Sequence, residues 1–585
     1  MHSHRTDQVL DGVAPEPVRS PEDGRGGDGG KDVEQRARDG GTANASSGPE
    51  DDTIVIPLAL TSLSDSFSLS DHLRSNGLPD LPLPAYNPKH QSPFEWTIRK
   101  KTIVLIGPVF AAMLSAYAAG AYAMTQQPLM EKWSVTPTVY NVGITIFVCG
   151  FAIAPMMLAP ISEVYGRYWV FAGAGGVFFL GTLGCAVTES LAGMLVARLI
   201  VGCAASVYAT LSGGAIADLF HKENRNAPMA AYAITIMVGT GLGPLISGAV
   251  VDRAGWRWVY YHQMILLAVA TLNIVLTLDE TRSNVVLRRK CAALNKHFAS
   301  LDDTSWEPST AGEKGDDAAA PAATQPRKIR FAAEVAEPKL EIALIWRSFA
   351  FPLRLLFTES VVFWFSTWLA FAWAVLYMQF SSIGFVFRNS YGFNSTQVGA
   401  VYTAIIVGAS LSGFSNIFLE STLQRLFPRR MASPEGRLLS TCYESVLLPI
   451  GLFWFGWGAH TNAHWIVPTL GIGSITMGIF SIYLAVFNYL ADTYHQYSSS
   501  AQAAQSMCRN LLAGIFPLIT HLLWGNLSYG AAGSLLGAIA FVLMAVPWVL
   551  SLFGERIRAR SPFAQDHKED SAQESSNETG EDGRV

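Results

Sequence analysis

The chain has 585 residues, of which half are apolar and 15% are charged, and its formal net charge is −5. A soluble globular protein carries about 25% charged residues, and this net charge is too small to indicate a polyanionic partner. Because the six cysteines include no CxxC pair, they indicate neither a zinc site nor a disulfide framework. The apolar composition disfavours a cytosolic enzyme, a disulfide-bonded secreted protein and a nucleic-acid binder.

Three polar stretches frame the chain. Residues 1–98 are rich in Gly, Pro, Ser and Asp and lack periodicity, which predicts a disordered cytoplasmic tail. No short apolar core follows a basic start in this tail, so we expect no cleaved signal peptide. Residues 280–358 form a polar cytoplasmic linker, and residues 555–585 form a polar cytoplasmic C-terminal tail. We interpret these stretches as solvated chain, and the alternative is that they carry phosphorylation or degradation signals.

Between the polar stretches, apolar runs of about 20 residues recur, which is the length that crosses a bilayer as a helix. Six runs fall in residues 99–279, near 103–125, 139–159, 169–187, 191–215, 229–250 and 258–278. Six more fall in residues 359–554, near 360–382, 397–418, 440–458, 465–487, 503–524 and 531–553. The runs are too long for barrel strands and do not alternate. We therefore predict an all-α integral membrane protein with 12 transmembrane helices in two six-helix halves.

Lysine and arginine flank the apolar runs unevenly. When the flanks are taken in alternation, the side that holds both termini and the linker carries most of them, and the other side carries Lys132, Arg253, Arg257 and Arg388. Because Lys and Arg collect on the cytoplasmic side, the termini and the linker are predicted to be cytoplasmic. Two six-helix halves around an inside linker are typical of transporters whose substrate binds near mid-membrane, between the halves.

Charged side chains inside the runs are functional candidates, because such a charge is costly unless it has a partner. Arg198, Glu444 and Arg509 are the candidates for proton coupling. For Arg198 the alternative is a structural arginine bonded to backbone carbonyls of a neighbouring helix, and for Arg509 it is snorkelling to the membrane edge. Glu444 is able to carry a proton if it is buried, but it could equally face the cytoplasm as a carboxylate at a helix N-terminus.

The segment APISEVYGRYWV, residues 159–170, joins the second and third runs. It resembles the loop signature of the major facilitator superfamily, G-x-L-(S/A)-D-x-x-G-R-R, through Ser162, Glu163, Gly166 and Arg167. The chain departs from the signature at its first glycine and at its second basic position. A carboxylate and a guanidinium beside a tight turn can hold two helix ends in one conformation and release them in another, so we expect a conformational latch here.

The fifth run contains GTGLGPLISG, residues 239–248. It resembles the antiporter signature of the same superfamily, G-x-x-x-G-P-x-x-G-G, through Gly239, Gly243, Pro244 and Gly248. Small residues four apart make a groove for a neighbouring helix, and proline adds a bend. The alternative is ordinary packing of small residues, but the loop motif that precedes it in the chain makes the joint signal specific.

The second half resembles one branch of this superfamily, the fungal twelve-span drug:proton antiporters, which include polyamine and multidrug exporters. Segments such as NSYGFNSTQVGAVY and SPEGRLLSTCYESVLLPIGLFWFGW carry the resemblance, which covers approximately residues 95–560. It implies the major facilitator fold and export of drugs, toxins or amphipathic secondary metabolites, glycolipids among them, by alternating access driven by the inward proton gradient. We expect no cofactor besides that gradient, no metal and no catalytic residue, hence no enzyme.

The resemblance also implies partners and a place in the cell. The partners are a small-molecule substrate, protons and the lipid bilayer, with no nucleic acid, and we expect a monomer in the plasma membrane or, alternatively, the vacuolar membrane. Candidate cavity residues are aromatic or amide side chains, which could equally be packing residues: Tyr117, Tyr122, Trp368, Tyr377 and Asn488. Two other interpretations stay open, namely transport of one specific nutrient or polyamine by the same fold, and a membrane receptor that transports nothing.

Overall fold

The computed structural model describes residues 53–64, 68–75, 90–221, 224–302, 328–333, 342–431, 433–461, 463–494 and 497–559. The expectations for residues 1–52 and 560–585 of the two tails lie outside the described residues. Within the described part, 12 helices are long and apolar enough to cross a membrane, which confirms the predicted number of spans.

The first half contains six membrane helices at the predicted places. They are α2 (Ile98–Met124), α4 (Pro137–Tyr165), α5 (Arg167–Val187), α6 (Leu191–Leu219), α7 (Asn226–Ala254) and α8 (Trp256–Thr277). A short helix, α3 (Gln126–Trp133), lies between α2 and α4. Side-chain caps set several helix starts: the hydroxyl of Thr136 accepts a hydrogen bond from the Val139 amide, and Pro137 takes the first position of α4.

The second half contains the other six spans, and three of them are broken. The continuous helices are α11 (Ser360–Tyr391), α17 (Ile466–Tyr494) and α18 (Ser498–Asn526). The broken ones are α12 (Ser395–Val401) with α13 (Thr403–Leu426), α15 (Pro434–Glu444) with α16 (Leu447–His460), and α19 (Tyr529–Leu543) with α20 (Ala545–Arg558). The short α14 (Pro428–Met431) precedes α15. The apolar runs pass through these breaks, so hydropathy alone does not predict them.

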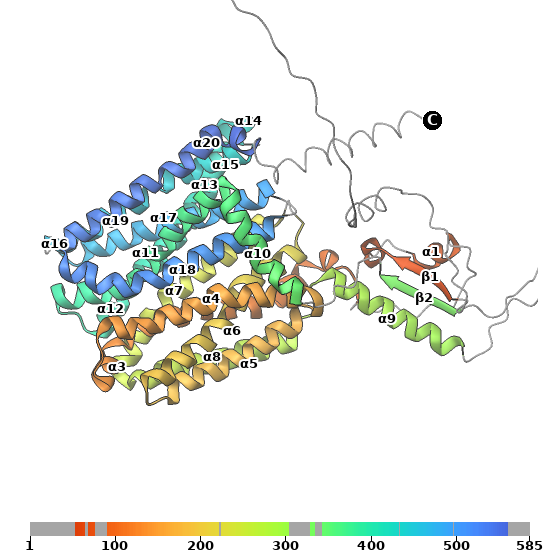
Figure 1. Ribbon diagram of the computed structural model, residues 1–585, viewed down its shortest axis with the longest axis horizontal. Helices are drawn as coiled ribbons and strands as arrows, with labels where there is room; N and C mark the ends of the chain where they lie inside the picture. The colour runs from red at the N-terminus through yellow and green to blue at the C-terminus, as the bar shows by residue number, and fades with distance from the viewer. Residues whose placement is uncertain are drawn as a thin grey trace, which may run out of the picture. The chain divides into compact units, whose positions relative to one another are not determined.

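The two halves meet along two groups of helices. In one group α4 packs against α18, and in the other α7 packs against α12 and α13 (Figure 1). The outer faces carry large apolar side chains: Leu276 and Phe418 are each 73% exposed, and Val542 is 70% exposed. Water solvates such a surface poorly, whereas lipid tails solvate it well, so the outer faces agree with an integral membrane protein.

The N-terminal tail and the linker contain elements that the sequence pattern does not predict. In the tail these are β1 (Thr53–Leu58), η2 (Leu60–Leu63), α1 (Leu69–Ser75) and η4 (Pro93–Glu95). In the linker they are α9 (Ser283–Asp302), β2 (Lys328–Ala333) and α10 (Ile342–Thr358). The expectation of a disordered tail is therefore wrong for these residues, and the linker, expected to be solvated polar chain, contains two helices and a strand among its described residues.

Short apolar stretches account for this order. β1 and β2 pair in a two-stranded sheet. Asn295 of α9 accepts a hydrogen bond from the Phe331 amide at 2.6 Å and donates one to the Phe331 carbonyl at 2.9 Å. The rings of Phe298 and Phe331 pack with their centres 5.3 Å apart, and both residues are buried. Helix α9 of the linker thus gives β2 an apolar packing partner.

Candidate functional site

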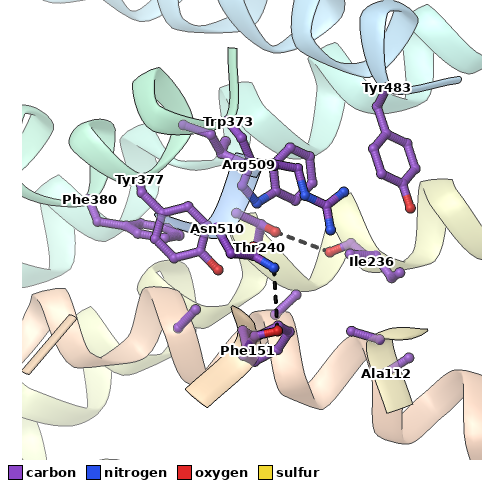
Figure 2. Close-up of a pocket in the computed structure, with 14 residues that line it drawn as sticks. Ala112, Phe151, Ile236, Thr240, Trp373, Tyr377, Phe380, Tyr483, Arg509 and Asn510 are labelled. Atoms are coloured by element: carbon purple, nitrogen blue, oxygen red, sulfur yellow. Dashed lines mark hydrogen bonds between the residues drawn. The ribbon is translucent and has the colours of Figure 1, made fainter. Parts of the chain in front are cut away.

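A cavity lies between the two halves, and helices of both contribute to its wall (Figure 2). It holds about 530 Å³ of space not filled by atoms, part of it continuous with the outside. The first half supplies mainly small and aliphatic side chains: Ala112, Ala116, Ala119, Phe151, Ala209, Ile236 and Thr240. The second half supplies mainly aromatic and polar ones: Trp373, Leu376, Tyr377, Phe380, Tyr483, Arg509 and Asn510. An apolar wall with a few polar groups is typical of a small-molecule site.

Three aromatic residues of α11 line the cavity because their spacing places them on one face of the helix. Trp373, Tyr377 and Phe380 are four and three residues apart, which is the spacing of neighbours on a helix surface. Tyr483 of α17 stacks against Trp373 with ring centres 5.4 Å apart. The spacing on α11 is visible in the sequence and is the signal that identifies Trp373 and Phe380, which lie outside the predicted set.

Arg509 of α18 is part of the cavity wall and is 7% exposed. Its guanidinium carbon lies 4.5 Å from the ring centre of Trp373 and 5.5 Å from that of Tyr483 (Figure 2). Nη2 donates a hydrogen bond to Ser506 Oγ at 3.3 Å, whereas Nε and Nη1 have no hydrogen-bond partner among the described residues. Snorkelling to the membrane edge is therefore the wrong interpretation, because the guanidinium lies between the helices.

Hydrogen bonds join the two halves toward the end of the cavity that lies away from the linker. Near the start of α4, Asn141 donates to the Pro517 carbonyl at 2.8 Å and accepts from Ser381 Oγ at 3.2 Å. One turn further along α4, Thr145 donates to the Gly514 carbonyl at 2.7 Å. The halves can separate at this end only if these bonds break.

The glycine motif on α7 brings that helix close to α2 of its own half and to α12 of the other half. Its residues are Gly239, Gly243, Pro244 and Gly248. A Cβ atom on Gly243 would lie 2.4 Å from the carbonyl oxygen of Tyr117 in α2. A Cβ atom on Gly248 would lie 2.4 Å from the carbonyl oxygen of Ser395 in α12, which belongs to the other half. Gly239 and Pro244 also face α2, so the motif forms a contact surface between helices rather than part of the cavity wall.

The loop motif between α4 and α5 is held by charged residues from other connections. Arg167 Nε lies 2.5 Å from Asp218 Oδ2 at the end of α6. Arg282, which follows α8, lies 3.2 Å from the same carboxylate and 3.9 Å from Glu163. The two charged residues of the motif therefore pair with separate partners. Sequence spacing does not predict that Arg282 contacts both Asp218 and Glu163, since Arg282 is far from both of them in the chain.

The turn itself depends on Gly166 and on a buried carboxylate. Gly166 has a φ of 95°, and a Cβ atom there would lie 2.1 Å from Glu280 Oε2. Glu280 Oε1 accepts a hydrogen bond from the Arg167 amide at 3.0 Å. Ser162 donates to the Ala159 carbonyl at 2.7 Å within α4. Glu280 thus takes the role of a cap at the start of α5, where Gly166 offers no side chain.

Arg198 of α6 is 1% exposed and lies outside the cavity wall. Its Nε donates to the Gly143 carbonyl of α4 at 3.2 Å, and its Nη1 donates to the Ala118 carbonyl of α2 at 3.1 Å. The guanidinium carbon lies 4.3 Å from the ring centres of both Tyr122 and Phe147. These are the contacts expected of the structural alternative, and a role of Arg198 in proton coupling stays a prediction.

Glu444 ends α15 at the break before α16 and is 5% exposed. Its carboxylate accepts hydrogen bonds from Ser412 Oγ and Asn416 Nδ2, both at 3.4 Å, and from Ser415 Oγ. All three donors lie on α13. A cytoplasm-facing carboxylate at a helix N-terminus is therefore the wrong interpretation, because Glu444 is buried and lies at the C-terminal end of its helix.

One of the predicted cavity residues, Tyr377, lines the cavity, and the others, Tyr117, Tyr122, Trp368 and Asn488, are not part of its wall. The Tyr117 hydroxyl lies 2.6 Å from Nε2 of His262 on α8. Tyr122 and Trp368 are buried in helix packing, and Asn488 is exposed. Residue type alone does not separate a cavity face from a packing face, which explains these misplacements.

Comparison with known proteins agrees with this architecture. The family model of the Major Facilitator Superfamily matches residues 109–517. The MFS transporter prlG of a fungal species (strain NRRL 50135) is 32% identical over 81% of this chain and 95% of its own. Efflux pump FUBT of Fusarium oxysporum is 28% identical over 80% and 74%. The probable drug/proton antiporter YHK8 of Saccharomyces cerevisiae is 27% identical over 78% and 84%.

Solved structures share the fold at low sequence identity. The peptide transporter POT in complex with sulfate superposes with a TM-score of 0.55 at 11% identity, over 81% of this chain and 99% of that one. The E. coli xylose transporter XylE, in a partially occluded inward open conformation, gives a TM-score of 0.51 at 14% identity, over 77% and 98%. The chain is therefore an integral membrane protein of the Major Facilitator Superfamily, related to fungal transporters of that superfamily.

Proposed function

We propose that this protein exports small amphipathic molecules, such as drugs, toxins or secondary metabolites, in exchange for protons. The observation that carries the proposal is the aromatic cavity between the halves, with Asn141 and Thr145 bonded across toward one end. Such a cavity serves the two membrane faces in turn when the halves rock about it. The names of two relatives, an efflux pump and a probable drug/proton antiporter, support export and proton exchange.

Alternating access requires contacts that stabilise one state and break in the other. The bonds of Asn141 and Thr145 to α11 and α18 fill that role at the end away from the linker. The close approach of Gly248 to Ser395 gives α7 and α12 a tight contact from which the halves can rotate. A bound substrate shifts this equilibrium only by its different affinity for the two states.

The three candidates for proton coupling differ in chemistry. An arginine keeps its proton at physiological pH, so Arg198 and Arg509 can act only through their fixed positive charge. Glu444 is able to take up and release a proton, and it is the proposed carrier. Protonation would change its hydrogen bonds to Ser412 and Ser415 of α13, a helix that packs against α7 of the other half.

We also propose that the transporter acts in the plasma membrane, with the vacuolar membrane as the alternative, and with both tails and the linker in the cytoplasm. The proton gradient is the proposed energy source, without another cofactor, and a monomer suffices because both halves of the cavity belong to one chain. The charge asymmetry of the flanking lysines and arginines supports this orientation.

Transport into proteoliposomes with an acidic interior tests the proposal. Two naphthalene probes of opposite charge, 2-naphthalenesulfonate and trimethyl(2-naphthylmethyl)ammonium, cross a bare bilayer slowly because of their fixed charges. We expect at least one to accumulate in the vesicles and to leave when a protonophore removes the gradient. Protein-free liposomes are the control. Failure of both probes to accumulate, or accumulation that ignores the gradient, would contradict proton-driven export.

A further inference from the structure

The cavity wall carries a positive charge without a negative one beside it. All of its lining residues are described, and Arg509 is the ionised one among them, since no Asp or Glu lines the cavity. The ionised side chain on the cavity wall is therefore a cation.

The contacts of Arg509 compensate only part of the hydration that its guanidinium loses on burial. A guanidinium does not lose its proton when buried, so the charge persists at 7% exposure. The ring faces of Trp373 and Tyr483 and the hydroxyl of Ser506 compensate some of the lost hydration. Nε and Nη1 stay without an acceptor among the described residues. A buried charge with unfilled donors is destabilising unless something else completes it.

Arg198, another buried arginine of the bundle, shows what a structural arrangement looks like here. Arg198 directs its Nε and Nη1 to two backbone carbonyls on neighbouring helices, and only its Nη2 has no hydrogen-bond partner among the described residues. The same two nitrogens of Arg509 have no such acceptor, and the guanidinium lies among the cavity residues, as Figure 2 shows. The difference indicates that Arg509 is arranged to meet a ligand.

We propose that the cavity selects organic anions: amphipathic acids whose carboxylate, sulfonate or other acidic group accepts hydrogen bonds from the free nitrogens of Arg509. The apolar body of the acid packs against Trp373, Tyr377 and Phe380, opposite the small alanines of α2. This inference rests on the proposed export function, for which it names the substrate class. An acid fills the unmet donors and cancels the buried charge, whereas a cation of the same size is repelled.

Selectivity follows from this arrangement. A hydrogen bond to a charged group is worth more than one between neutral groups, so a neutral isostere of the acid loses roughly tenfold or more in affinity. A matched pair with the same ring system isolates this effect, because the apolar contacts stay the same. The pair is 2-naphthalenesulfonate and 2-naphthalenesulfonamide.

Titration calorimetry on the full chain in lipid nanodiscs measures the preference. We expect wild-type protein to bind the sulfonate about tenfold or more tightly than the sulfonamide. Arg509→Gln should bind both about equally, and Arg509→Lys should keep part of the preference, since it keeps the charge. Arg257→Gln is the matched control, because Arg257 is 40% exposed and pairs with Glu189 away from the cavity. It should leave the preference unchanged.

A second variant covers the case in which Arg509→Gln fails to fold. Ala116→Asp places a carboxylate in the cavity wall and leaves Arg509 in place, so it should also remove the preference for the sulfonate. Equal binding of both probes by wild-type protein, no binding of the sulfonate, or a preference that survives in folded Arg509→Gln and in folded Ala116→Asp overturns the inference.

Transport separates this inference from the proposed function. If the trimethylammonium probe accumulates with the proton gradient while the sulfonate does not, export stands and the anion proposal is overturned. If the sulfonate accumulates and the ammonium probe does not, both are supported. If neither probe accumulates although the sulfonate binds through Arg509, the anion site stands and proton-driven export fails.

Discussion

Arg167 and Asp218 tie the start of α5 to the end of α6, with the guanidinium Nε 2.5 Å from a carboxylate oxygen. Arg282 reaches the same carboxylate and also approaches Glu163. The loop motif is thus one part of a network that fixes the linker-side ends of several helices in the first half. Because Arg167 and Asp218 are largely buried, at 7% and 11% side-chain exposure, the pair is sensitive to the loss of either partner.

Substitution of either partner should destabilise the first half. We expect Asp218→Asn to cost about 3 kcal/mol, because it leaves the Arg167 charge unpaired in a poorly hydrated site, and Arg167→Gln to cost less, because Arg282 still pairs with Asp218. The double variant should lose less stability than the sum of the two single variants, since neither of the two charges then stays buried without the other. Thermal unfolding in detergent measures the three differences, and strictly additive losses would show that the two residues act independently.

Gly243→Leu should abolish transport, because its side chain has no room beside the Tyr117 carbonyl of α2. Gly173→Leu is the matched control: it lies on α5, where a Cβ atom would meet nothing within 4 Å. Transport rates in proteoliposomes, normalised to the amount of folded protein, measure both. A fully active Gly243→Leu variant would mean that the close contact between α2 and α7 is dispensable.

Glu444→Gln should remove the pH dependence of transport, because an amide keeps the hydrogen-bonding shape of a protonated carboxyl but cannot release a proton. The measurement is the rate of probe exchange across a range of pH without a gradient. Glu420→Gln, on the same α13 that bonds to Glu444, is the control and should retain the wild-type profile. An unaltered pH profile in Glu444→Gln excludes this residue as the proton carrier.

Arg198→Ala should abolish export while the protein still reaches the membrane. It should also lower the stability by about 2 kcal/mol, because the carbonyls of Gly143 and Ala118 lose a charged donor. Efflux, membrane localisation and thermal unfolding of one preparation separate the two effects. Normal efflux at reduced stability would assign to Arg198 a structural role alone and remove it from coupling.

The stability that Glu189 contributes through its exposed contacts with Lys132 and Arg257 should decrease in acid. A hydrogen bond from Lys132, together with Arg257, holds the pKa of the Glu189 carboxyl below its usual 4.5. A lowered folded-state pKa stabilises the fold above the unfolded value, and this contribution disappears as the pH falls through the folded pKa. The difference in melting temperature between wild type and Glu189→Gln should therefore be present at neutral pH and disappear as the pH falls below 4.5 through the lowered folded-state pKa. A difference independent of pH would contradict the pairing.

The number and order of the spans could be predicted because a bilayer demands about 20 apolar residues in each span. The breaks near Tyr402, Ser445 and Met544 could not, since the apolar runs continue through them. The sheet of the tail and linker escaped prediction for a different reason. Each strand is a short apolar stretch in a polar segment, and its partner is far away in the chain.

The site was partly predictable. Motif spacing identified Arg167 and Gly243, but their partners Asp218 and Tyr117 come from helices whose pairing only the folded bundle defines. Arg509 was identified by its charge within an apolar run. Whether it reaches the membrane edge or the cavity depends on how deeply α18 is packed between α4 and α11, which one sequence does not state.

Proton movement coupled to substrate movement tests the central claim most directly. Proteoliposomes that contain a pH-sensitive dye, without an initial gradient, receive 2-naphthalenesulfonate or the trimethylammonium probe from outside. We predict that entry of the transported probe drives protons out, so the interior becomes more alkaline, and that Gly243→Leu abolishes both signals. Entry of a probe through the protein with no change in interior pH would contradict proton exchange.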